Sequence, residues 1–291
     1  MPNIHIVTDS SAHFTNTHIL HQQPVTVVPN KISIAGKTYL EGVDLDAETA
    51  LRLIAHQQFA PTVISPTESD YFEIYSRLAR SHDAIISIHA SREILPSWAN
   101  ARAAARQLAG HCQIEVIDSQ TISAGQAMLV RMALKAIERD EAADDIVRSV
   151  RGAVERVFSI YYVETINYLL QNKIMTPSHS ILGVMLGIKP LLTIEQGQLR
   201  PMEKVRTRAQ AVERLVEFVV EFTDIDDVVI LQNRPYMNEQ TRMLQDRLAV
   251  EFPGRHFPYT MYGPSLAAHL GPDVTGVVVL ESEIQELDDD F

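Results

Sequence analysis

Short apolar runs alternate with stretches of helical periodicity through the first half of the chain. Residues 4–7, 84–88 and 114–117 are apolar over the length of a buried strand. Between and after them, apolar positions recur every three or four residues in five segments: 45–57, 68–81, 97–110, 123–138 and 142–157. Strands that alternate with helices are typical of a parallel sheet covered on both faces. The pattern therefore predicts a three-layer α/β/α domain with a parallel sheet over residues 1–155.

The pattern changes after residue 156, where hairpins mix with helices. Residues 188–194 and 198–205 flank Gln196-Gly197, a pair that is typical of an antiparallel hairpin. Further strands are expected over 158–163, 228–231, 257–262 and 277–280, and helices over 164–172, 206–222 and 238–252. We predict a two-layer α/β domain with a mixed sheet over residues 156–291. A ligand site is expected at the interface of the two domains.

Composition supports two packed domains and excludes some partners. The 291 residues are 46% hydrophobic, which is enough for a core in each half. Asp and Glu number 37 against 25 Lys and Arg, a net charge of −12. Binding to nucleic acid or to anionic lipid headgroups needs a basic face, so neither partner is expected.

The chain carries no sign of secretion or of a membrane span. Cys112 is the single cysteine, so no disulfide can form within the chain and a reducing compartment fits. The N-terminus enters a strand without the basic and long apolar regions of a signal peptide. The apolar runs are shorter than a membrane span. We expect a cytoplasmic protein without stable membrane insertion.

Two Gly-Pro steps bracket residues 263–272 and predict a rigid loop that presents Ser265 and His269. Residues 263–267 match the G-x-S-x-G signature of a nucleophilic serine at every position except the last, which is alanine. In that class of hydrolase, the acid and the histidine of the catalytic triad follow the serine at some distance. Here His269 lies only four residues after Ser265, and few residues remain after it. A turn that contacts a ligand or shapes the fold is favoured. The alternative is a small serine hydrolase or acyltransferase that uses Ser265 or Ser10 with His269.

No motif for a cofactor or metal emerges. The glycine-rich phosphate-binding patterns are absent from the sequence. His13, His18 and His21 lie close together, but no cysteine or acid at metal-ligand spacing accompanies them. A solvated loop is favoured over a zinc site, and neither a metal nor a cofactor is expected.

Hydroxyl side chains gather in the loops next to the predicted strands. They are Thr8, Ser10, Ser11, Thr62, Ser65, Ser91 and Ser119. In an open parallel sheet, ligands bind beyond the carboxyl ends of the strands. The same hydroxyls can also cap the helices that follow, so both interpretations stay open.

Several segments, taken in order along the chain, form a joint pattern. They are Ile6-Val7-Thr8-Asp9-Ser10-Ser11, residues 61–67, Ser97-Trp98-Ala99-Asn100-Ala101, Val116-Ile117-Asp118-Ser119 with Ser123-Ala124-Gly125, Ile188-Lys189-Pro190, Lys204-Val205-Arg206 and residues 263–272. Together these segments resemble the DegV family of bacterial lipid-binding proteins. The resemblance implies two domains with a long-chain fatty acid in a tunnel between them. It also implies a separate kinase subunit that phosphorylates the acyl carboxylate, and no catalytic machinery in this chain.

The same resemblance implies a set of lipid-binding residues, with departures from the family pattern. The threonine of the family's T-S-Q-P loop falls on Val63, or on Thr62 if the loop has one extra residue. The serine of L-S-G-T-Y falls on Leu95 and its threonine on Ser97. The arginine of G-G-R-I becomes Lys173. The predicted site also includes Ser10 and His269.

These departures should weaken the binding of the headgroup more than the binding of the acyl chain. A buried carboxylate needs several hydrogen-bond donors, and Val63 and Leu95 supply none. Each buried methylene still contributes about 0.8 kcal/mol. We therefore expect a lipid-binding protein whose headgroup preference differs from that for a simple free fatty acid. A third possibility is a ligand-binding sensor that has no kinase partner.

Overall fold

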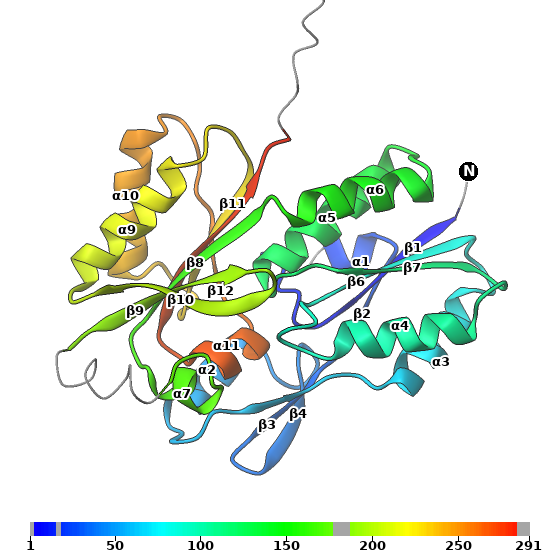
Figure 1. The fold of residues 1–291 in the computed structure, drawn as a ribbon, viewed down its shortest axis with the longest axis horizontal. Coiled ribbons are helices and arrows are strands. Elements are labelled where there is room, and N and C mark those ends of the chain that lie inside the picture. Colours follow the sequence, from blue (N-terminus) through cyan, green and yellow to red (C-terminus); the bar gives the residue numbers. More distant parts are fainter. Residues whose placement is uncertain (1–2, 16–18, 177–186, 284–291) are drawn as a thin grey trace, which may run out of the picture.

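The computed structural model describes residues 3–15, 19–176 and 187–283 (Figure 1). Its elements in chain order are β1 (Ile4–Asp9), α1 (Ile19–Gln22), β2 (Val25–Val28), β3 (Lys31–Ile34), β4 (Lys37–Leu40), α2 (Ala47–Ala55), β5 (Thr62–Ile64), α3 (Glu68–Leu78), β6 (Ala84–His89), α4 (Ser97–Gln107), β7 (Gln113–Asp118), α5 (Ala124–Glu138), α6 (Ala143–Val154), β8 (Val157–Val163), α7 (Asn167–Gln171), β9 (Lys189–Glu195), β10 (Gln198–Val205), α9 (Arg208–Val220), β11 (Ile225–Gln232), α10 (Glu239–Glu251), β12 (Tyr259–Met261), α11 (Pro264–Leu270) and β13 (Val274–Glu281).

The first half of the chain folds as a three-layer α/β/α unit. Four parallel strands pair in the order β2-β1-β6-β7. Helices α3 and α4 cover one face of this sheet, and α5 and α6 cover the other (Figure 1). Side chains alternate along β1, so Ile6 joins the core on the α5 side and Val7 joins the core on the α3 side. The predicted parallel sheet with helices on both faces is confirmed.

The second half contains a mixed sheet of six strands in the order β10-β9-β8-β13-β11-β12. All neighbours are antiparallel except β11 and β12. Helices α9 and α10 pack on one face, where Leu215 and Leu244 are fully buried. The predicted two-layer α/β arrangement is confirmed. The boundary between residues 155 and 156 stays a prediction, although β8 begins close to it.

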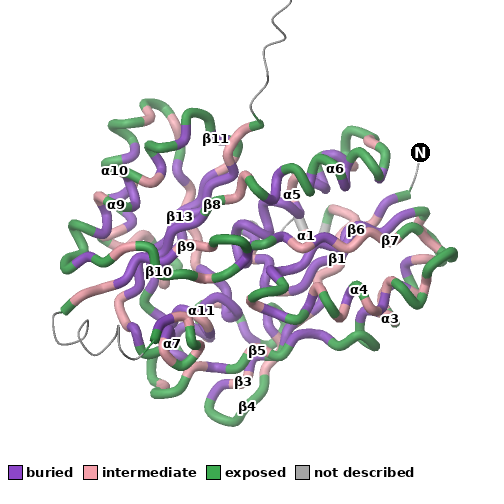
Figure 2. Tube along the Cα trace, viewed as in Figure 1, coloured by how far each residue is buried: buried purple, intermediate pink, exposed green. Residues whose placement is uncertain are grey.

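Helix α5 joins the two halves. It contacts β1 and β6 of the parallel sheet and also β8 and β13 of the mixed sheet. Its residues are buried on nearly every side, as the purple trace in Figure 2 shows. One continuous apolar cluster extends from Ile6 through Met128 of α5 to Tyr161 and Val278. The two halves therefore share a core instead of meeting at a polar surface.

Two segments differ from the sequence prediction. Residues 61–66 were expected to form a loop, but Thr62–Ile64 is strand β5, which pairs antiparallel with β3 in a small sheet of order β4-β3-β5. The expected loop over residues 263–272 is largely helix α11. Pro264 suits the first helical turn, where its missing N–H is no loss. Gly271, with a φ of 96°, ends the helix.

In the residues that the structure describes, no helix combines the length and apolar character needed to cross a lipid bilayer.

Candidate functional site

Helix α11 brings together several residues of the predicted site. It contacts α7 and β5, and it also packs on α2. Asn172, directly after α7, donates its side-chain amide to the backbone oxygen of Ala268 at 2.9 Å and to that of His269 at 3.3 Å. His269 on α11, the end of α7 and the strand that carries Thr62 and Val63 therefore meet in one region.

His269 presents a nitrogen with no partner in this region. The ring is partly exposed, but its Nε2 atom is buried and makes no hydrogen bond with the described residues. Burial lowers the pKa of His269 to about 4, so the imidazole is neutral at pH 7. A neutral imidazole nitrogen donates or accepts one hydrogen bond, depending on the tautomer. A ligand group that reaches Nε2 would satisfy it.

A buried pair of hydroxyls lies at the start of α4. Ser97 is fully buried and donates from Oγ to the Ser65 Oγ at 3.0 Å. The Asn100 side chain donates to the backbone oxygen of Pro66 at 2.8 Å, which fixes α4 against the end of the β5 segment. Ser65 was noted in the sequence only as one of several loop hydroxyls, because the contact with Ser97 joins residues 32 positions apart.

The other predicted residues divide into apolar and exposed positions. Leu95 is buried in the shared core, and Val63 packs against that core from β5. Thr62 points the other way along the same strand and is exposed. Lys173 is also exposed, in a left-handed turn with a φ of 58°. Val63, which faces the core, therefore has no hydroxyl, whereas the hydroxyl of Thr62 faces away from the core.

Ser10 belongs to a separate polar cluster around Glu41. Its Oγ donates to Glu41 Oε2 at 2.7 Å and accepts from the Asn30 N–H at 2.8 Å. Ser265 donates its N–H to Glu41 Oε1 at 2.7 Å and its Oγ to Oε2 at 2.6 Å. In the described residues no hydrogen bond joins Ser265 or Ser10 to His269, the pairing that the hydrolase alternative needs.

A Ser–His–Asp chain does occur elsewhere, and sequence reasoning missed it. His89 Nδ1 lies 2.8 Å from Asp9 Oδ2, and His89 Nε2 lies 2.7 Å from Ser87 Oγ. All three residues are fully buried, and the Tyr75 hydroxyl lies 2.7 Å from Ser87 Oγ. Because Ser87 is fully buried, a substrate has no access to it, and we interpret this chain of polar groups as structural. In the sequence it was indicated only by Ser87 and His89, two polar residues in an otherwise apolar run.

No group of three or more potential ligands that could hold a metal ion occurs in the described residues. His18, one of the three neighbouring histidines in the sequence, lies outside those residues.

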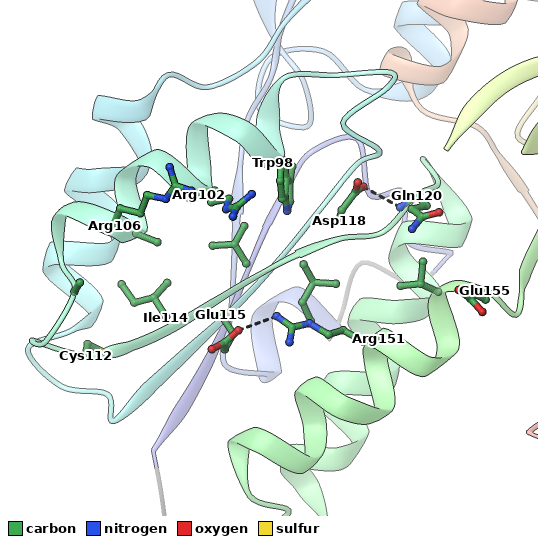
Figure 3. A pocket seen from close by; sticks show the side chains of 15 residues that line it. Trp98, Arg102, Arg106, Cys112, Ile114, Glu115, Asp118, Gln120, Arg151 and Glu155 are labelled. Carbon is green, nitrogen blue, oxygen red and sulfur yellow. Dashed lines mark hydrogen bonds and ion pairs between the residues drawn. The ribbon is translucent and has the colours of Figure 1, made fainter. Parts of the chain in front are cut away.

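A hollow of about 680 Å³ runs along β7 between α4 and α6, and Figure 3 shows its walls. Arg102 lies over the Trp98 ring, 4.9 Å from its centre, and Arg151 pairs with Glu115 at 2.8 Å. Asp118 and other acids also line it, so charges of both signs surround the space. None of the predicted lipid-binding residues lines this hollow, and its walls do not suit an acyl chain.

The chain is similar to one protein family over nearly its whole length. Residues 3–282 match the sequence model of a family described as uncharacterised protein, DegV family. A DegV domain-containing protein of Caldanaerobacter subterraneus subsp. tengcongensis is 27% identical over 282 residues, which cover 95% of this chain and 98% of the relative. Protein DegV of Bacillus subtilis is 25% identical over 280 residues, covering 94% and 98%.

Solved structures with the same fold include two that are described as fatty acid binding. A DegV family protein of Streptococcus agalactiae superposes with a TM-score of 0.87 at 25% identity, covering 97% of this chain and 100% of the other. DegV of Bacillus subtilis superposes with a TM-score of 0.83 at 23% identity, with the same coverage.

Proposed function

Because the chain belongs to the DegV family, we propose that it binds a long-chain fatty acid or a related lipid in a tunnel between its two domains. Relatives with this fold are described as fatty acid binding. The proposed headgroup site is the region where α11, α7 and β5 meet. It includes His269 on α11, Lys173 after α7, and Ser97, whose partner Ser65 follows β5. The protein acts as a carrier in this proposal and performs no chemistry of its own.

The observation that carries the proposal is the buried Nε2 of His269, which has no hydrogen-bond partner among the residues that the structure describes. A buried polar atom without a hydrogen bond costs free energy, and folded proteins rarely leave one unsatisfied. A lipid headgroup at this position would accept a hydrogen bond from the imidazole or donate one to it. His269 also matches the histidine that the family resemblance assigns to the lipid site.

The apolar replacements suggest how the headgroup is held. Leu95 and Val63 remove two hydroxyls, which leaves Ser97, its partner Ser65 and His269 as polar candidates. Fewer donors weaken the hold on an ionised carboxylate. The hydrocarbon chain then supplies most of the affinity, at about 0.8 kcal/mol for each buried methylene. A protonated acid or an uncharged headgroup is better tolerated here than in relatives that keep both hydroxyls.

Titration of oleate and methyl oleate into the protein tests this proposal. We expect both ligands to bind. His269→Leu should lower the affinity for oleate about tenfold, because it removes one hydrogen bond to a charged group. His256→Gln, a change at an exposed histidine, should leave both affinities unaltered. Absence of oleate binding to the unaltered protein would exclude the lipid site.

We also propose that the loaded protein presents its lipid to a fatty-acid kinase subunit. The support is the family resemblance, which implies such a kinase subunit. Oleate-loaded protein, mixed with such a subunit and ATP, should yield an acyl phosphate that hydroxylamine traps as a hydroxamate. A protein that binds oleate but yields no hydroxamate would instead fit a sensor.

A further inference from the structure

Glu41, directly after β4, is a buried acid without a charged partner. It accepts hydrogen bonds from Ser10 Oγ, Asn30 Nδ2 at 3.1 Å, and both Oγ and N–H of Ser265. All of these donors are neutral, and no Lys, Arg or His side chain pairs with Glu41 in the described residues. Only 3% of the residue is exposed, and burial raises the pKa of its carboxyl. A buried acid in this setting lacks the cation that usually offsets its burial.

The two carboxyl oxygens differ in how far they are satisfied. Oε2 accepts from three donors, whereas Oε1 accepts only from the N–H of Ser265. Oε1 is therefore the less satisfied of the two oxygens and the one that a further donor would reach. A side chain added at Gly263 would lie 3.6 Å from Oε1 and 3.1 Å from His13 Nδ1. The absence of a side chain at Gly263 therefore avoids a close contact with His13 and leaves Oε1 uncrowded from that side.

A mostly apolar cavity of about 380 Å³ lies against Glu41. Its walls include Phe14, Leu20, Val27 and Leu45. This volume is in the range that holds small organic ligands. We call this cavity the Glu41 pocket.

The charges around the Glu41 pocket are of one sign. Glu41 and Asp46 are the acids in its described lining, and that lining contains no Lys or Arg. His13 also lines it, but burial lowers the pKa of His13 to about 4, so the ring is neutral at pH 7. A ligand that complements this pocket carries a positive charge on an apolar body.

We propose that the Glu41 pocket binds a small organic cation, a protonated primary amine on an aliphatic chain. The ammonium donates to Glu41 Oε1 and supplies the missing counter-charge. The aliphatic chain packs against Phe14, Leu20 and Val27. This inference goes beyond lipid carriage, because a fatty-acid carboxylate would meet the acid Glu41 here. The two sites therefore differ in the headgroup that they accept.

Calorimetric titration of the full chain at pH 7 with three probes of equal chain length tests the inference. The probes are n-octylammonium, 1-octanol and octanoate. We expect n-octylammonium to bind most tightly and octanoate most weakly. Glu41→Gln keeps the size of the side chain and removes its charge, so the affinity for n-octylammonium should fall about tenfold or more. The affinity for 1-octanol should change by less than about threefold, because an alcohol makes no charge-assisted hydrogen bond.

Glu48→Gln is the matched control, since Glu48 is exposed in the first turn of α2 and does not line the pocket. It should leave all three affinities unchanged. If Glu41→Gln does not fold, Ala47→Leu fills the pocket from its wall and should remove binding of both n-octylammonium and 1-octanol. Equal affinities for n-octylammonium and 1-octanol, or n-octylammonium binding that survives Glu41→Gln or Ala47→Leu, would overturn the proposal.

Oleate, titrated into the same protein, separates this inference from the proposed lipid function. Oleate binding without n-octylammonium binding overturns the Glu41 pocket alone. Binding of n-octylammonium without oleate binding supports the pocket and removes the lipid site. Bound oleate should not displace n-octylammonium, and full competition between them would contradict two separate sites.

Discussion

At the scale of single residues, buried polar groups carry most of the functional information. Among the described residues, His269 has a buried nitrogen without a hydrogen bond at the proposed headgroup site, and Glu41 is a buried acid without a charged partner beside its own pocket. Sequence reasoning identified His269 through a motif. It could not identify Glu41, because the contact with Ser265 joins residues 224 positions apart. Periodicity reports which side chains are buried, but it does not report which of them meet.

The lowered pKa values of two histidines predict that acid destabilises the protein. Burial lowers the pKa values of His13 and His269 to about 4, so the unfolded chain binds more protons between pH 6.5 and 4. Their contribution to stability is present above pH 6.5 and is lost as the pH falls toward 4. Urea unfolding at pH 7.0 and 5.5 should show this loss.

Removing one of these histidines should reduce that pH dependence. His269→Gln should lose less stability than the unaltered protein between pH 7.0 and 5.5, by up to about 1 kcal/mol. The exposed His111→Gln is the control and should follow the unaltered protein. An identical pH dependence in all three proteins would mean that His269 is not kept neutral by burial. Glu41 has the opposite effect on the pH dependence of stability. Its pKa is raised in the folded protein, so its contribution to the free energy of unfolding is lost as the pH rises.

At the scale of elements, the alternation of strands and helices was readable from the sequence, but strand β5 and helix α11 were not. The buried strands and the amphipathic helices have enough residues for their periods to show. Strand β5 has only three residues between prolines and exists because β3 pairs with it. Helix α11 has seven residues within a Gly-Pro pattern that resembles a loop. Both missed elements belong to the proposed site, where tertiary contacts outweigh local preference.

Two glycines provide a matched test of element packing. A Cβ on Gly276 of β13 would lie 2.6 Å from Tyr161 Cδ1 and 3.0 Å from the backbone oxygen of Ile160. Gly276→Ala should therefore lower the free energy of unfolding by about 1–3 kcal/mol. Gly152, exposed in α6, has no atom within 4 Å of that position. Gly152→Ala should raise stability by about 0.5–1 kcal/mol. Chemical denaturation measures both, and shifts of the same sign would contradict this packing.

At the scale of the whole molecule, the two halves are held together at several points. Ser91, beyond β6, donates from Oγ to the backbone oxygen of Gly197 at 2.7 Å, at the tip of the β9–β10 hairpin. Arg131 of α5 pairs with Asp227 of β11. The order of elements predicted the two sheets, but how the sheets pack on α5 depends on contacts that no local pattern encodes. We propose that the lipid lies between halves held in this way.

The most direct test of lipid carriage is mass spectrometry of lipid extracted from the purified full chain. We expect a long-chain fatty acid or related acyl lipid at about one molecule per protein. The same preparation of His269→Leu should carry less, because its headgroup site lacks the imidazole. Protein that yields no acyl lipid, and whose melting temperature does not change with added oleate, would contradict the account.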